Sequence, residues 1–398
     1  MPVVGRDPRG FLTLDALRSL LDETTEPPAS ALTRIVELTR RALDADSVRV
    51  LIADYGFVSL QELGRDGPIG PPQSIEGTLA GRAFAKNEIV VSGESPTVVW
   101  VPLVDTSERL GVLEITCSTW GDDTRATLDP IVRIVVLVLV STRRYTDVVH
   151  RSRRAQPLSL AAEVQWDLLP PLSCSTERAS ISGFLEPAYS IGGDSFDYAV
   201  NPGCIEFAII DAVGHGMASV LLSVAAINCW RNARREGASL GTAYSDTSDV
   251  IATQFGNSRF VTGQLGRLML ETGELTWLNA GHPLPLLVRD GTFIGELACA
   301  PSLPMGLGGP VNEIATETLQ PGDRVLFFSD GVVETRSPDG EQFGVARLAD
   351  FLVRATLDQV FPAETVRRLS GLITTYNSTG LTDDATLLLI EYHGTSRD

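Results

Sequence analysis

Lysine is almost absent from this sequence, in which Lys86 stands alone among 32 basic residues. The 50 acidic residues outnumber the basic ones and give a net charge of −18. Nucleic-acid binding draws its affinity from Lys and Arg side chains that neutralise phosphates. The charge balance therefore argues against a nucleic-acid partner.

Cysteine is also scarce, and its spacing carries no metal or disulfide pattern. The five cysteines are scattered without a CxxC pair, so neither a zinc site nor a disulfide framework is indicated. A reducing setting suits such cysteines best. Arg6 and Asp7 interrupt the N-terminus, which has no apolar core of signal-peptide length. We therefore expect a cytoplasmic protein.

No apolar run is long enough to span a bilayer. The most membrane-like stretch is 131–140, which Arg133 interrupts. It falls far short of the roughly 20 apolar residues that a spanning helix needs, so a buried or dimerising helix is the better interpretation.

The length and composition predict more than one folded domain. At 398 residues the chain exceeds the size at which one hydrophobic core usually stops growing. A hydrophobic fraction of 43% with 21% charged residues is ordinary for a well-packed protein. We predict three parts: an N-terminal α/β domain with a lead-in helix over 1–126, a helical linker over 127–170, and a second domain over 171–398.

The first part has the pattern of a helix followed by an antiparallel sheet with an inserted helix. A helical period runs over 30–43, strands are indicated over 47–52, 57–63, 89–91, 98–104 and 110–116, and a short helix over 77–85. The segments SIEGTLAGRAF, over 74–84, and WVPLV, over 100–104, followed by LGVL, over 110–113, resemble those of a GAF domain. A packing and dimerisation module without a ligand and a ligand-sensing module both fit this resemblance, and the first is favoured because no Cys or His is placed to anchor a chromophore or metal.

The segment 127–169 lacks glycine and carries a long helical pattern. Such a helix between two domains would couple them, and two chains could pair along it to form a homodimer. The arginine-rich section near 143–154 is interpreted as a solvated face. Pro157 is expected to interrupt the helix, and Pro170 to end it.

The second part combines many strands with helices grouped in its middle and near its end, which predicts a two-sheet α+β sandwich with helices outside. Four acidic positions share one context, at the end of an apolar strand or beside a glycine turn. They are Asp194, Asp211, Asp330 and the pair Asp383 and Asp384. One such Asp is more often a turn residue than a metal ligand. Four in one domain indicate a shared site, and oxygen ligands without Cys or clustered His suit Mg²⁺ or Mn²⁺.

Residues from about 160 to 393 resemble the SpoIIE and RsbU-like serine/threonine phosphatases of the protein phosphatase 2C class. The matching blocks are QWDLLP (165–170), IGGDSFD (191–197), DAVGHG (211–216), FVT (260–262), NAGHP (279–283), GD (322–323) with SDGVVE (329–334), FG (343–344) and TDDAT (382–386).

The resemblance implies an αββα sandwich with two Mg²⁺ or Mn²⁺ ions between its sheets. It makes Asp194, Asp211, Asp330 and Asp383 metal ligands, with the Ala212 carbonyl assisting Asp211, and Asp384 a supporting candidate. Two such cations would lower the pKa of a bridging water and offset phosphate charge during in-line attack. His215 fits either a general acid for the leaving oxygen or, as favoured here, a residue that orients the ligands. His282 is interpreted as holding a turn, and the glycine-rich stretch 306–310 as a loop, because it lacks the Lys of a P-loop.

Two functions follow as hypotheses. The first is a metal-dependent phosphoserine/phosphothreonine protein phosphatase controlled by the GAF-like domain, whose substrate, by resemblance, is a phosphorylated anti-sigma-factor antagonist of the STAS type. The second is a catalytically silent signalling scaffold that binds the same kind of partner. The complete carboxylate set favours the enzyme.

Overall fold

The protein is described by a computed structural model that covers residues 28–93, 96–118, 120–189, 192–256, 258–377 and 383–394. The lead-in helix predicted before residue 28 lies outside these ranges, as do Ile191 and Thr382 of the two carboxylate motifs. The chain divides after Pro157 into two compact units. Within the described ranges, no helix combines the length and the apolar character that crossing a bilayer would take.

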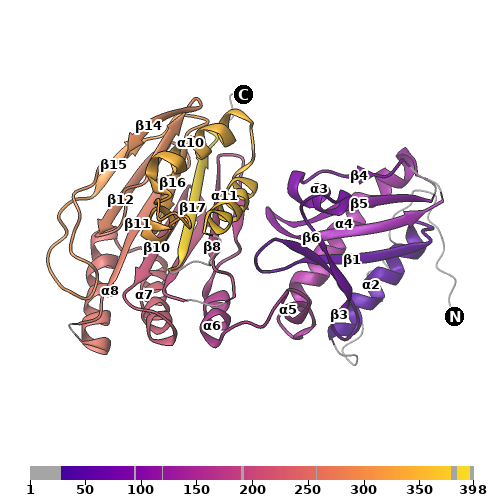
Figure 1. Ribbon diagram of the computed structural model, residues 1–398, viewed down its shortest axis with the longest axis horizontal. Coiled ribbons are helices and arrows are strands. Elements are labelled where there is room, and N and C mark those ends of the chain that lie inside the picture. Colours follow the sequence, from indigo (N-terminus) through magenta and orange to yellow (C-terminus); the bar gives the residue numbers. More distant parts are fainter. Residues whose placement is uncertain are drawn as a thin grey trace. The chain divides into compact units, whose positions relative to one another are not determined.

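The N-terminal unit is an antiparallel sheet with helices on both faces (Figure 1). Its helices are α2 (Pro28–Ala42), α3 (Leu79–Lys86), α4 (Asp122–Thr142) and α5 (Val148–Ser152). Its strands are β1 (Ser47–Ala53), β2 (Ser59–Leu63), β3 (Pro68–Ser74), β4 (Val90–Val91), β5 (Thr97–Asp105) and β6 (Glu108–Cys117), in the order β3-β2-β1-β6-β5-β4. The sequence pattern missed β3, whose prolines at 68, 71 and 72 resemble a loop but are tolerated in an edge strand.

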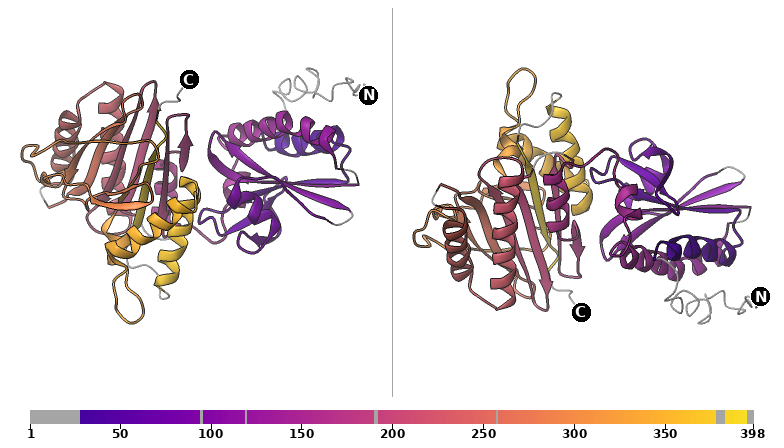
Figure 2. Two further views of the ribbon diagram at one scale, coloured as in Figure 1. Left: turned by 90° about the horizontal axis from the view of Figure 1, so that it is seen from above. Right: turned by 90° about the horizontal axis from the view of Figure 1, so that it is seen from below.

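The main core of this unit lies between the sheet and the helices α2 and α4. Val48, Val50 and Ile52 alternate along β1 and pack in one cluster with Ile35 of α2 and Val135 of α4. Helix α3 covers the opposite face of the sheet (Figure 2). The alternating pattern of β1 therefore sets which face receives the helix pair.

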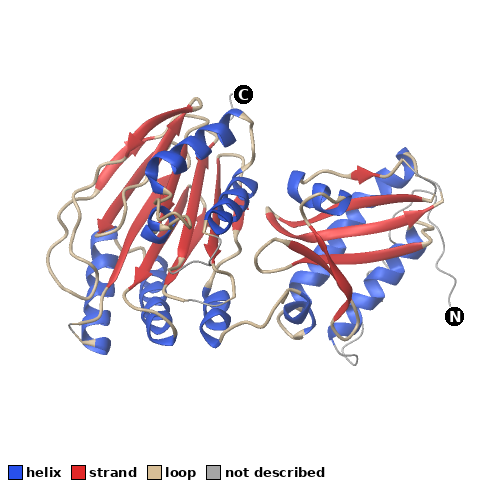
Figure 3. Ribbon diagram, in the orientation of Figure 1, coloured by secondary structure: helices blue, strands red, loops and turns tan. Residues whose placement is uncertain are grey.

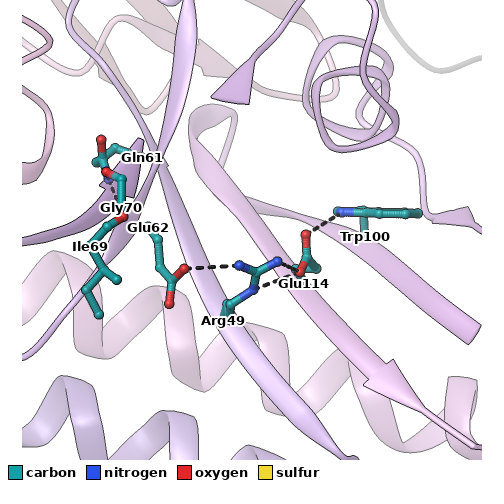
Figure 4. Close-up of polar contacts among 7 residues, drawn as sticks. All are labelled: Arg49, Gln61, Glu62, Ile69, Gly70, Trp100 and Glu114. Carbon is teal, nitrogen blue, oxygen red and sulfur yellow. Dashed lines mark hydrogen bonds and ion pairs between the residues drawn. The ribbon is translucent and has the colours of Figure 1, made fainter. Parts of the chain in front are cut away.

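A partly buried polar network crosses four strands on the sheet face opposite that core. The Arg49 guanidinium donates to Glu114 through Nε at 2.8 Å and to Glu62 at 3.1 Å (Figure 4). The Trp100 indole N–H donates to the other oxygen of Glu114 at 2.9 Å. Glu114 is nearly inaccessible to solvent, so its charge requires these partners. The network stabilises the alignment of β1, β2, β5 and β6.

The helical segment predicted over 127–169 is interrupted near Pro157, as expected, but it also breaks after Thr142 and so forms three helices. Helix α4 ends at Thr142, α5 covers 148–152, and α6 begins at Leu160. The apolar stripe of α4, which includes Ile131, Val135 and Leu139, is buried in the N-terminal core. The polar segment after Thr142 has no apolar stripe to bury, so the helix ends there. The first half of the predicted linker is therefore an integral part of the N-terminal unit.

The C-terminal unit is a four-layered αββα sandwich, as predicted (Figures 1 and 3). Its helices are α6 (Leu160–Leu168), α7 (Met217–Arg235), α8 (Leu240–Phe255), α9 (Asp330–Glu334), α10 (Gly344–Leu357) and α11 (Pro362–Tyr376). One sheet has the order β15-β12-β11-β10-β9, with β9 (Asp194–Asn201), β10 (Cys204–Ala212), β11 (Val261–Met269), β12 (Glu274–Ala280) and β15 (Ala315–Thr318). The other has the order β14-β13-β16-β17-β8-β7, with β7 (Ser173–Ser175), β8 (Ala179–Glu186), β13 (Leu286–Arg289), β14 (Thr292–Glu296), β16 (Arg324–Phe328) and β17 (Ala385–Tyr392).

The two sheets pack face to face through large aromatic side chains. The rings of Phe207 on β10 and Phe327 on β16 lie 4.7 Å apart between centroids. Gly266 on the neighbouring strand β11 makes room for Phe207, because a Cβ there would lie 2.2 Å from its ring. Helices α7 and α8 pack on one sheet, and α10 and α11 on the other (Figure 2). This packing fixes the spacing of the strand ends that carry the predicted metal ligands.

Candidate metal centre

Two of the predicted ligands are neighbours at one end of the same sheet. Strands β9 and β10 pair in a register that places Asp194 directly opposite Asp211. The apolar run ahead of Asp211 is fully buried, so the strand delivers this carboxylate to the edge of the core. Asp194 is itself only 2% exposed. A buried carboxylate facing a second one requires a cation or a proton.

Two further aspartates reach this site from the other sheet, where β17 begins. The backbone N–H of Asp194 donates to Oδ2 of Asp384 at 3.1 Å, which links the two sheets directly. The backbone N–H of Asp384 in turn donates to Oδ1 of Asp383 at 2.9 Å. Asp384 therefore positions the main chain of Asp194, and Asp383 is the more exposed of the pair.

The fifth aspartate, Asp330, opens the short helix α9, where the sequence pattern predicted a turn. Ser329 precedes it and is held against β17, since its hydroxyl accepts from the Thr386 N–H at 2.9 Å and its N–H donates to the Thr386 carbonyl at 3.1 Å. Gly331 passes so close to Asp384 that a Cβ would lie 1.9 Å from the Asp384 carbonyl oxygen. Only glycine at position 331 lets α9 approach the start of β17 this closely, and the approach brings Asp330 beside β17.

The pKa values of these aspartates show that the carboxylates interact. Burial, reinforced by Asp211 and Asp384, raises the pKa of Asp194 well above its ordinary value, and the Ser329 and Thr386 hydroxyls oppose the rise. Burial raises the pKa of Asp211 to about 6, and Asp330 and Asp383 add to the rise. Burial also raises the pKa of Asp330, with Asp383 and Glu334 adding to it. Finally, burial raises the pKa of Asp384 to about 7. All five predicted aspartates thus share one electrostatic site.

The donor set fits a hard divalent cation. Oδ2 of Asp194 and Oδ1 of Asp384 are buried and accept no hydrogen bond. Among the described residues, none of the five aspartates forms an ion pair with Arg, Lys or His. In the same ranges, no three acidic, His or Cys side chains already surround one point at metal-binding distance, as expected where carboxylates repel one another. Unpaired buried carboxylate oxygens are the ligands that Mg²⁺ and Mn²⁺ take.

The glycine loop before Asp194 is held by side chains that the sequence analysis did not assign. Gln165 of α6 donates to the Asp194 carbonyl at 2.6 Å. The hydroxyls of Ser219 and Ser223, one turn apart on α7, donate to the carbonyls of Gly192 and Gly193. Their i, i+4 spacing at the start of α7 was the available signal, but only the fold shows what they contact. These bonds tie α6 and α7 to the carboxylate loop.

The remaining candidates differ in their surroundings. Ala212 is buried at the end of β10, and a Cβ on Gly193 would lie 3.3 Å from its carbonyl oxygen. His215 is exposed in the turn between β10 and α7. His282 is buried, and burial lowers its pKa to about 3. Its main chain exchanges hydrogen bonds with the Asn279 side chain at 2.7 and 2.9 Å, so Asn279 closes this turn. The His282 ring nitrogen Nδ1 lies 3.1 Å from the Thr262 hydroxyl.

Several known proteins are similar to the C-terminal unit. Residues 201–393 match the family model described as stage II sporulation protein E. Over these residues the C-terminal unit is similar to SpoIIE proteins. The unit also includes β8 and β9, which precede the matched residues but complete the two sheets.

Individual relatives and structures resemble only part of the chain. Protein IcfG of Synechocystis is 24% identical over 250 residues, which cover 54% of this chain and 39% of IcfG. Phosphoserine phosphatase RsbU of Bacillus subtilis is 25% identical over 186 residues, or 46% of this chain and 55% of RsbU. The SiaA-PP2C domain of Pseudomonas aeruginosa matches in fold with a TM-score of 0.50 and 20% identity, over 58% of this chain and 94% of that domain. The chain thus spans about half the length of the curated relatives it matches, or less.

Proposed function

We propose that this protein is a metal-dependent phosphoserine/phosphothreonine protein phosphatase. The observation that carries the proposal is the convergence of five aspartates from both sheets. Burial and neighbouring carboxylates raise the pKa values of Asp194, Asp211, Asp330 and Asp384, and two of the buried oxygens accept no hydrogen bond. A purely structural cluster of this kind would be costly to bury. The family of the C-terminal unit supports the same conclusion.

The proposed ligands of two Mn²⁺ or Mg²⁺ ions are Asp194, Asp211, Asp330 and Asp383, with the Ala212 carbonyl beside Asp211. When bound, such ions supply an activated water and offset the negative charge of the phosphate. Asp384 positions the main chain of Asp194 through the bond between the sheets and is a supporting ligand candidate. The sandwich core behind Asp211 excludes water from one side of the site.

His215 is proposed to move a proton at the mouth of the site. A residue that orients metal ligands needs a hydrogen bond to them, whereas His215 is exposed and makes no side-chain hydrogen bond to the described residues. Its position four residues after Asp211, in an exposed turn, instead suits proton transfer to the leaving serine oxygen.

One assay tests both proposals. Purified full chain should release phosphate from a phosphoserine peptide and from an aryl phosphate only when Mn²⁺ or Mg²⁺ is present. If His215 protonates the leaving oxygen, His215→Gln should slow the peptide reaction by about 100-fold and leave the aryl ester, a good leaving group, nearly unchanged. Metal-independent turnover, or none, would contradict the phosphatase. Equal losses on both substrates would contradict the role of His215.

The substrate is proposed to be a phosphorylated anti-sigma-factor antagonist of the STAS type, acted on in the cytoplasm. The relatedness of the C-terminal unit to RsbU-like phosphatases supports this class of partner. All five cysteines are free, in keeping with a reducing compartment.

The N-terminal GAF-like unit is proposed to control the phosphatase through α6. This helix begins at Leu160, shortly after the boundary between the units, and Gln165 on it holds the Asp194 carbonyl. A displacement of α6 would therefore reach a proposed metal ligand through one hydrogen bond. Helix α7 would follow, because Ser219 and Ser223 hold the same loop.

Dimerisation through the predicted linker is proposed to use the outer face of α4. Leu137 on this helix is 67% exposed, although its neighbours Val135 and Leu139 are buried. We expect Leu137→Glu to convert a dimer into a monomer in light scattering, because a charge would have to be buried in the interface. Leu357→Glu, at a 64% exposed leucine of α10, introduces the same charge away from α4 and should leave the dimer unchanged. A wild-type monomer, or an unchanged Leu137→Glu dimer, would contradict this arrangement.

A further inference from the structure

An arginine that belongs to none of the predicted motif roles lies at the carboxylate end of the sheet. Arg259 is in the loop between α8 and β11, two residues before the strand begins. In the register of β10 and β11, Val261 pairs with Ala212 and Thr262 with Asp211. Arg259 therefore lies just beyond the strand end that carries Asp211.

The Arg259 guanidinium reaches the turn that follows Asp211. Its NH1 lies 3.4 Å from the position that a Cβ on Gly214 would occupy. Gly214 has φ +99°, a conformation that favours glycine, so the turn presents bare backbone to the guanidinium. The Arg259 side chain is exposed and forms no hydrogen bond or ion pair with the described part of the chain. This leaves a cation without a partner next to the turn that follows Asp211.

Hydrogen bonds hold the main chain around Arg259, whereas the side chain has no bonding partner among the described residues. Its N–H donates to the Gly256 carbonyl at 3.2 Å, and the Val213 N–H donates to the Phe260 carbonyl at 3.1 Å. On the other side, a Cβ on Gly306 would lie 2.7 Å from the Arg259 carbonyl oxygen, so only glycine fits there. The loop thus holds the base of the side chain next to the turn that contains His215.

We propose that Arg259 binds the phosphate of the phosphoserine or phosphothreonine substrate, an inference that rests on the proposed function. A phosphate dianion approaching the aspartates is repelled by every carboxylate that a metal does not neutralise. A guanidinium presents paired N–H donors that match two phosphate oxygens, and a fixed base lowers the entropy cost of that contact. Arg259 is a substrate-binding residue, and the Gly306 loop positions it.

The test compares Arg259→Ala and Arg259→Lys with Arg235→Ala. Arg235 is exposed at the far end of α7, about 27 Å along the helix from Met217, and Arg235→Ala is the matched loss of one positive charge. Mn²⁺-dependent hydrolysis of an aryl phosphate gives KM and kcat for each variant. Titration calorimetry of the Mn²⁺-loaded protein with inorganic phosphate gives a binding constant that does not depend on turnover.

For Arg259→Ala we expect about a 10- to 100-fold weaker phosphate affinity and a similar rise in KM, with a smaller change in kcat, because a charge-assisted hydrogen bond is lost. Arg259→Lys keeps the charge but loses the paired donors, so it should fall between Arg259→Ala and the wild type. Arg235→Ala should bind phosphate and turn over the aryl phosphate like the wild type. The Mn²⁺ affinity and the melting temperature should be unchanged in all three variants.

Wild-type phosphate affinity in Arg259→Ala would overturn the inference, as would equal losses in Arg259→Ala and Arg235→Ala, which would reflect net charge alone. Failure of the proposed function is separately visible, because it would abolish metal-dependent turnover in the wild type. The phosphate titration would still decide whether Arg259 binds the anion.

Discussion

Asp211→Asn is expected to reduce Mn²⁺-dependent phosphatase turnover by about 1000-fold, because a cation held at an active site contributes several kcal/mol to transition-state stabilisation. Asp211 lies opposite Asp194 and interacts electrostatically with Asp330 and Asp383. It thus has carboxylate neighbours from both sheets. Asn keeps the size of the side chain but removes the charge that holds the metal. Phosphate release from a phosphoserine peptide, measured at saturating Mn²⁺, provides the readout.

Two controls separate a lost ligand from a lost fold. Asp249→Asn removes one exposed carboxylate from α8 and should leave turnover unchanged. The Asp211→Asn protein itself should melt no lower than the wild type when metal is absent, because the substitution removes a carboxylate that repels its neighbours. Full activity in Asp211→Asn would eliminate the proposed metal centre, whatever the other variants do.

The metal-free protein should be more stable at pH 5 than at pH 8, and divalent metal should reverse much of that difference. Burial raises the pKa of Asp211 from 3.8 to about 6 and that of Asp384 from 3.8 to about 7. Between pH 4 and 7 the folded state therefore binds more protons than the unfolded state, and stability falls as pH rises. The shift of Asp211 alone corresponds to up to about 3 kcal/mol. We expect the melting temperature to fall on the order of 5–10 °C between pH 5 and 8 in chelator.

Mn²⁺ binds the ionised carboxylates, so it should raise the melting temperature strongly at pH 8 and weakly at pH 5, where protons compete. Asp384→Asn serves as the matched variant, since it removes one group with a raised pKa and should flatten the pH dependence of the metal-free protein. Equal stabilisation by Mn²⁺ at both pH values would show that the aspartates are not the groups that bind it.

The sequence pattern predicted most helices and strands in which the periodicity of the apolar residues determines the buried face. Helix α7 is one of the helices predicted in the middle of the second part, and β10 and β17 are apolar strands that adjoin the predicted aspartates. The sequence pattern missed elements that depend on contacts with neighbouring strands or helices. Helix α9 is short, and Ser329, which precedes it, is held by its contacts with β17. Helix α4 ends at Thr142 because its apolar stripe reaches the end of the N-terminal core there. No glycine or proline marks this end in the sequence.

From the sequence alone we predicted the similarity of the C-terminal unit to SpoIIE proteins and the sandwich, and we identified five aspartates as candidate ligands, because these predictions depend on residue type and local context. Tertiary structure alone decided how the aspartates meet. The bond from Asp194 to Asp384 joins residues 190 positions apart, and the contacts of Gln165 and Arg259 with the site arise from separate loops and helices. Such contacts are set by strand register and sheet packing, which no local pattern encodes.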